Sequence, residues 1–148
     1  MSILGDSKNK TLAQTIKFMD IKQACIETQK ELEAENLNYP LKFEESSETK
    51  EIVGLKCHKV KVTKQTAPYD CFDIWYTKEL GMPYCNALTV YAPIKGVLVD
   101  YQIRKMGLEL RFIAKSYTPE DVPDNTFEIP ASMKIVSKEE MAKVFEGL

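Results

Sequence analysis

The chain has 148 residues, with 20 Lys and Arg against 22 Asp and Glu, so its formal net charge is −2. A chain so close to neutral has no long-range field that would draw it onto DNA, RNA or an acidic bilayer, and no nucleic-acid partner is expected. A hydrophobic fraction of 44% and a charged fraction of 28% exclude disorder and collagen. The length suits one core, so we predict a single domain over residues 1–148.

The sequence predicts no membrane span and no export signal. No window approaches the roughly 18 to 20 consecutive apolar residues that a spanning helix needs, and the N-terminus lacks an apolar signal core and a cleavage site. The N-terminus is either native or that of a mature or truncated form, because residues 2–4 resemble the end of a strand whose partners would lie upstream.

The first 40 residues predict a hairpin and a short helix. Residues 11–18 alternate apolar and polar side chains and, with residues 2–4, form a hairpin across the polar turn between them. Thr28 followed by Glu31 fits a capping box, and a run of helix formers then continues to Tyr39-Pro40. This helix is mostly polar, so we expect it to lie across a sheet edge or barrel mouth.

Three antiparallel strands are predicted next. Residues 41–45 alternate, residues 51–63 read as a longer strand around Gly54, and residues 71–77 place apolar side chains on one side. Residues 78–95 lack periodicity, so they are predicted as a loop or a short helical turn, of the kind that often sits over a cavity in β domains.

The clearest pattern is a second hairpin at residues 96–117. Its two amphipathic strands are joined by Lys105-Met106-Gly107. Alternation predicts one shared face on each strand, formed by Val97, Val99, Tyr101 and Ile103 on the first and by Leu108, Leu110, Phe112 and Ala114 on the second.

The C-terminal part predicts an exposed turn, two short strands and a helix. Residues 118–125 carry two prolines and several acids, and the strands follow at FEIP (127–130) and MKIV (133–136). Ser137 caps the helix and Glu140 completes a capping box. An apolar stripe is expected to dock the helix on the sheet; it consists of Met141, Val144, Phe145 and Leu148.

No motif predicts a metal site. The four cysteines form no CxxC pair, and the single His58 cannot complete a zinc site at these separations. Free thiols are the simpler interpretation, and the disulfide status stays open for Cys25, Cys57, Cys71 and Cys85.

Motifs for catalysis are equally absent. There is no Gly-rich phosphate loop, no GxSxG and no HExxH. Cys57 and His58 are adjacent on a strand and so point to opposite faces, and acids such as Asp70, Asp73 and Asp100 are usually solvated. We therefore predict that the protein is not an enzyme and has no catalytic residues and no cofactor.

Six to eight antiparallel strands with two short helices predict a mainly β fold with a minor α component. The helices are too small to cover a broad sheet, so a curved, unclosed half-barrel plugged by helices and loops is the expected solution.

Four segments in order resemble one family. They are EIVGLKCHKVKVT (51–63), FDIWYTKEL (72–80), residues 92–130 from APIKG to FEIP, and MKIVSKEEM (133–141). They are similar to Gram-negative envelope lipoproteins with a domain of unknown function, related to the GLPGLI proteins and with a fold like the lipoprotein carriers of outer-membrane sorting. The resemblance covers nearly the whole chain. It implies a periplasmic or outer-membrane-associated setting and a lipoprotein-carrier-like fold. Family members begin with a signal peptide and further strands, which implies that the front of the barrel is missing here.

Two hypotheses follow for function. The first is a non-enzymatic envelope protein whose half-barrel holds or senses an acyl chain, a lipid or a lipoprotein. The second is a structural or interaction protein with a filled core, which acts through an exposed sheet edge or the C-terminal helix. If the front of the barrel is missing, the strand at residues 11–18 or the one before it has an unpaired edge, where a second copy could form a homodimer by strand addition. Candidate cavity-lining residues for the first hypothesis are Ile74, Tyr76, Val99, Tyr101, Leu110 and Phe112.

Overall fold

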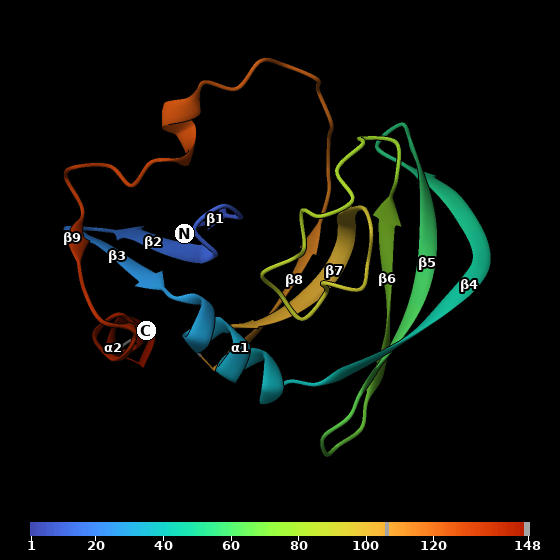
Figure 1. Cartoon of the computed structure of the whole chain (residues 1–148), viewed down its shortest axis with the longest axis horizontal. Coiled ribbons are helices and arrows are strands. Elements are labelled where there is room, and N and C mark those ends of the chain that lie inside the picture. Colours follow the sequence, from blue (N-terminus) through green and yellow to red (C-terminus); the bar gives the residue numbers. More distant parts are fainter. Residues whose placement is uncertain (106, 147–148) are drawn as a thin grey trace. The chain divides into compact units, whose positions relative to one another are not determined.

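The computed structural model describes residues 1–105 and 107–146 (Figure 1). They form two compact units, the first unit made of residues 1–34 with the described part of 120–148, and the second unit of residues 35–119. In this described part the chain is 46% strand and 15% helix, which confirms a mainly β fold with two short helices. Neither of its two sheets closes into a barrel, and none of its helices is long and apolar enough to cross a bilayer.

The first unit carries the first sheet, which within the described residues has the order β1 (Ser2–Asp6), β2 (Thr11–Phe18), β3 (Ile21–Glu27) and β9 (Lys134–Ile135). The first three strands are antiparallel neighbours, and β9 lies parallel to β3. The predicted hairpin of β1 and β2 is confirmed. Its turn is closed by Asp6, which accepts hydrogen bonds from the amides of Lys8 and Asn9 at 3.0 Å each.

Strand β3 is absent from the elements predicted above, because its sequence IKQACIE hides its alternation. Ala24 and Cys25 are both buried although they point to opposite faces, and the pattern is inverted at the end, where Ile26 is exposed and Glu27 is buried. A strand that buries a carboxylate and exposes an isoleucine does not look like an amphipathic strand.

Both predicted helix starts are confirmed. Before α1 (Gln29–Leu37), the Thr28 amide donates to Glu31 Oε2 at 2.7 Å and the Glu31 amide donates to Thr28 Oγ1 at 3.4 Å. Before α2 (Lys138–Glu146), Ser137 Oγ accepts from the Glu140 amide at 3.1 Å. These side chains satisfy amides that have no partner inside the helix.

Helix α2 contacts β3 and buries Met141, as the apolar stripe predicts; Leu148, the last member of that stripe, lies outside the described residues. The strand predicted at 127–130 was wrong. The chain instead forms a 3-10 helix, η1 (Asp124–Phe127), and only Lys134–Ile135 pairs within the predicted MKIV strand. Pro123 and Pro130 flank the segment and cannot donate to a ladder, which opposes strand pairing there.

The second unit carries the second sheet, an antiparallel meander in chain order within the described residues: β4 (Leu41–Ile52), β5 (Leu55–Lys64), β6 (Cys71–Thr77), β7 (Val97–Lys105) and β8 (Leu108–Ile113). Figure 1 shows β4 and β5 as long, curved strands. The single strand predicted around Gly54 was wrong, because Val53 and Gly54 have positive φ values of 48° and 81° and form the tight turn of a hairpin.

The hairpin of β7 and β8 is confirmed, with Tyr101 opposite Phe112 and Ile103 opposite Leu110; Met106 of its turn lies outside the described residues. Its predicted faces are wrong at two residues, Ala114 and Val99. Ala114 packs against the cluster that contains Trp75 and Val99. Trp75 pairs with Asp100 while its neighbour Tyr76 pairs with Leu98, so Val99 is an extra residue in a β-bulge. The bulge resets the alternation, and Val99 does not share a face with Tyr101.

The second sheet buries side chains on both faces. Val60 and Val62 pack with Ile74 and Tyr76 on one face, named here the tyrosine face. The other face, named here the tryptophan face, buries Leu55 and Cys57 with Trp75 and Val99. The buried positions of β5 change parity between Cys57 and Val60, which places them on opposite faces.

Candidate functional site

The six predicted lining residues do not surround a common space. Ile74 and Tyr76 are buried in the tyrosine face, and Tyr101 packs against them. Val99 lies on the tryptophan face. Phe112 stacks on Tyr101 with ring centroids 5.5 Å apart, and Leu110 is half-buried beside Ile103.

The tyrosine face is filled by the chain itself. The loop between β6 and β7 inserts Tyr91 and Ile94, both buried, against the strands. The Tyr91 ring lies 5.8 Å from Phe43 and 6.0 Å from Tyr101, and its hydroxyl donates to the Gln102 carbonyl oxygen. Burial raises the pKa of Tyr91 far above its usual range. This loop therefore packs against the sheet as part of its core.

The loop is held in place by side-chain hydrogen bonds to its backbone and by close packing at Gly96. Asn86 Nδ2 donates to the carbonyl oxygens of Ile94 and Gly96 at 2.9 and 2.8 Å. At Gly96 a Cβ atom would lie 2.4 Å from the Thr77 carbonyl oxygen, so no larger residue fits without movement. These contacts fix the position from which Tyr91 reaches the sheet.

A hollow of about 390 Å³ lies instead in the first unit. Its lining includes a row of three cross-strand neighbours, Leu4, Ala13 and Ile26, one each from β1, β2 and β3. Phe127 of η1 and Ile129 complete the apolar part. The polar part of the lining is the β1–β2 turn region, with Asp6, Ser7 and Thr11.

Two side chains of this lining are unusually exposed for apolar residues. Ile26 is 45% exposed and Phe127 is 62% exposed. Apolar atoms at one end and polar groups at the other match the general composition of small-molecule sites, and the volume is within the usual range of about 300–1,000 Å³. Sequence reasoning missed this hollow because it depends on β3 and on a segment about 100 residues further along the chain.

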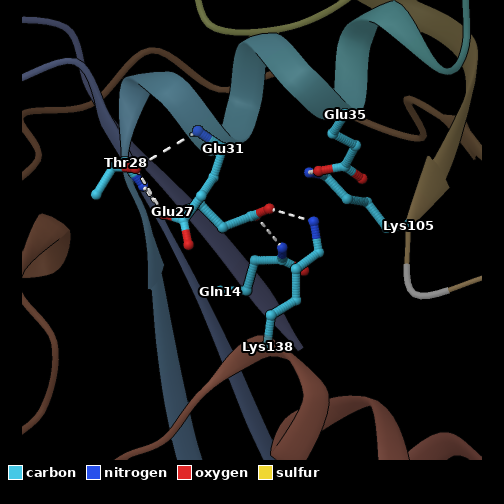
Figure 2. A network of polar contacts seen from close by, with 7 residues as sticks. All are labelled: Gln14, Glu27, Thr28, Glu31, Glu35, Lys105 and Lys138. Atoms are coloured by element: carbon cyan, nitrogen blue, oxygen red, sulfur yellow. Dashed lines mark hydrogen bonds and ion pairs between the residues drawn. The ribbon is translucent and has the colours of Figure 1, made fainter.

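The opposite face of the first sheet carries a buried ion pair. Glu27, only 1% exposed, is paired by Lys138 Nζ at 2.6 Å and accepts a hydrogen bond from Gln14 Nε2 (Figure 2). Lys138 is the first residue of α2, so the contact joins β3 to α2 across 111 positions of sequence. The pair connects the same two chain segments, 1–34 and 120–146, that line the hollow.

The thiols near these cores are poor nucleophile candidates. Burial, reinforced by the charge of Glu27, raises the pKa of Cys25, and burial likewise raises the pKa of Cys57. His58 lies on the face opposite Cys57, with its ring 5.6 Å from Tyr76. All four cysteines are free, and among residues 1–105 and 107–146 no group of three or more His, Cys, Asp or Glu could hold a metal ion.

The three carboxylates singled out from sequence lie in separate ion pairs. Asp100 forms a two-pronged contact with Arg111, at 2.9 Å to both Nε and Nη2. Asp73 pairs with Lys59 at 3.2 Å, and Asp70 lies 3.6 Å from Lys64. Each of the three acids therefore pairs with a different cation.

Comparisons with protein-family models, with curated proteins and with solved structures found no match.

Proposed function

We propose that the chain is a non-enzymatic binding protein that holds the apolar part of a small amphiphile, such as an acyl chain, in the hollow of the first sheet. The observation that carries this proposal is the hollow lined by the row of Leu4, Ala13 and Ile26 together with the exposed Phe127. Such a ligand would cover apolar surface that is now in water, which is worth roughly 25 cal/mol for each Å². The resemblance to envelope lipoproteins supports a periplasmic or outer-membrane-associated setting.

The hydroxyl groups of Ser7 and Thr11, beside the Asp6 carboxylate, give the hollow a polar end. Hydrogen bonds from Asn9 hold the pKa of Asp6 below its usual value, so this carboxylate is charged at neutral pH. A bound amphiphile would therefore place its chain along the Leu4 to Ile26 row and its polar end toward the turn.

A titration with a fluorescent apolar probe, followed by displacement with a medium-chain monoacylglycerol, tests the proposal, because the polar end of this ligand is neutral and is not repelled by the charged Asp6 carboxylate. Ile26→Glu puts a charge into the lining and is expected to weaken probe binding by at least tenfold, because a carboxylate in an apolar site must lose its hydration. Ile135→Glu is the matched control, since Ile135 is exposed on β9 of the same sheet and does not line the hollow. Binding that is absent, or equally weakened by both variants, would contradict the proposal.

A second candidate function is protein interaction through a sheet edge. The observation that favours it is the filled tyrosine face of the second sheet, together with the exposed apolar side chains of its outer strand β8. Light scattering after size exclusion, over a range of concentrations, tests this function. Self-association supports it, and a monomer at high concentration in the absence of any other partner counts against it.

A further inference from the structure

Strand β8 is an unprotected edge of the second sheet. In the described part of the chain β8 pairs with β7 alone, and its Leu108, Phe112 and Ile113 are exposed. The opposite edge, β4, has the usual protection: a register break between Glu45 and Thr49 and several charged side chains along its length. The two edges of one sheet therefore differ, and only β8 offers an apolar surface for strand addition.

The free hydrogen-bonding groups of β8 belong to its odd-numbered residues. The Ala114 amide donates to the Val99 carbonyl oxygen at 2.7 Å, so residue 114 faces β7. Backbone groups alternate along an antiparallel strand, which directs those of Leu108, Leu110 and Phe112 toward β7 as well. The amides and carbonyls of Glu109 and Arg111 then point outward, available to another strand.

We propose that β8 pairs antiparallel with β8 of a second copy of this chain, about a two-fold axis at Leu110. The sequence Leu108-Glu109-Leu110-Arg111-Phe112 is self-complementary in this register. Glu109 then lies opposite Arg111 of the second copy, and Leu108 opposite Phe112. This inference rests on the second candidate function and is independent of the hollow.

Charge selects this register over its neighbours. Outward groups must pair with outward groups, so the register can change only in steps that keep odd residues opposite odd residues. A shift to the next register in one direction places Glu109 opposite Glu109 of the second copy. A shift in the other direction places Arg111 opposite Arg111 of the second copy. Like charges directly opposite each other are destabilising, while opposite charges are stabilising.

Both charged side chains are already positioned for this contact. Glu109 is held by Lys64 at 2.8 Å and Arg111 by Asp100, yet each remains about half exposed. A carboxylate accepts more than one donor and a guanidinium has five N–H groups, so each can keep its present partner and gain another. Leu108, Leu110 and Phe112 would extend the apolar layer of Tyr101 and Ile103 into the second copy.

A cysteine cross-link tests the axis directly. In the proposed pair the two copies of residue 110 form a non-hydrogen-bonded pair with Cα atoms about 4.5 Å apart, within disulfide reach. With the exposed Cys71 and Cys85 changed to Ser, Leu110→Cys is expected to give a covalent dimer under mild oxidation. Leu108→Cys is the control, because its two copies would be four residues out of register, roughly 13 Å apart along the strands.

Charge mixing tests the same register without a cross-link. Glu109→Arg gives a strand with two positive charges and Arg111→Glu one with two negative charges, and each variant alone is expected to dimerise at least about tenfold more weakly than the native chain. Mixed in equal amounts, the two should form a heterodimer. Glu51→Arg, the same charge change on exposed β4, should leave association unchanged.

The possible outcomes distinguish failure of the β8 pairing from failure of the protein-interaction function on which it rests. A dimer that cross-links equally through residues 108 and 110, or that fails to respond to charge mixing, would overturn the β8 pairing while leaving an interaction role in place. A native chain that stays monomeric at millimolar concentration would overturn the self-pairing itself. An interaction role for β8 would then require a partner other than a second copy. Should Arg111→Glu not fold, the Leu110→Cys and Leu108→Cys comparison still decides.

Discussion

Replacing Tyr91 by Ala removes the side chain that fills the tyrosine face of the second sheet. Tyr91 is fully buried, contacts the rings of Phe43 and Tyr101, and donates a hydrogen bond to the Gln102 carbonyl oxygen. Truncation of a buried aromatic ring to Ala costs about 3–5 kcal/mol. Loss of the hydrogen bond adds about 1 kcal/mol, so the free energy of unfolding should fall by about 4–6 kcal/mol.

Tyr91→Phe separates the two contributions. It keeps the ring and removes only the hydroxyl, so the expected loss is about 1–2 kcal/mol, most of it from leaving the Gln102 carbonyl without its donor. Tyr84→Ala is the matched control in the same loop, because Tyr84 is exposed and its truncation should change stability by less than about 0.5 kcal/mol.

Urea unfolding followed by circular dichroism measures all three variants, with the slope against urea checked for each. The expected order of stability is native and Tyr84→Ala, then Tyr91→Phe, then Tyr91→Ala. If Tyr91→Ala lost no more stability than Tyr84→Ala, the loop would not be part of the core. An open cavity would then have to be considered at the positions first predicted from sequence, around Ile74 and Tyr76.

Three further predictions concern other parts of the chain. Lys138→Met should lower the free energy of unfolding by about 2–3 kcal/mol in a urea titration. This is less than the roughly 3–5 kcal/mol expected for a fully buried ion pair, because the Lys138 side chain is 33% exposed. A loss below about 0.5 kcal/mol would refute a stabilising role for the pair of Glu27 and Lys138. In the native protein a thiol reagent should modify the exposed Cys71 and Cys85, with Cys85 reacting more slowly because partial burial raises the pKa of its thiol, and should reach the buried Cys25 and Cys57 only after unfolding. Rapid reaction of all four would contradict the burial. The free energy of unfolding should fall above about pH 10, because the pKa of Tyr91 is raised in the folded state and only the unfolded state releases that proton. Tyr91→Phe should make this fall between neutral and alkaline pH smaller. If the variant lost stability with pH as steeply as the native chain, Tyr91 would not be its cause.

Local signals were sufficient for the β1–β2 and β7–β8 hairpins and for the helix starts. The capping box of Thr28 and Glu31 and the polar turn after Asp6 act within a few residues, so their effect is visible in the sequence. The hairpin of β7 and β8 was predictable for the same reason, because both strands and the turn are contiguous.

Features that depend on distant residues were not predictable. The bulge at Val99 exists only in relation to its neighbour β6, and it moved a predicted cavity residue to the tryptophan face. Tyr91 came from a segment with no periodicity, and nothing local showed that it would fill the face formed by Ile74 and Tyr76. The hollow needed β3, whose exposed Ile26 and buried Glu27 reverse the usual pattern.

An NMR titration of the isotope-labelled chain with a medium-chain monoacylglycerol is the most direct test of ligand binding. Binding in the hollow should give saturable shifts of the backbone amides of Ala13, Ile26 and Ile129, which line it, with those of Ile74 and Tyr76 unchanged. Shifts centred on the second sheet, or no saturable shift at any amide, would refute binding in the hollow.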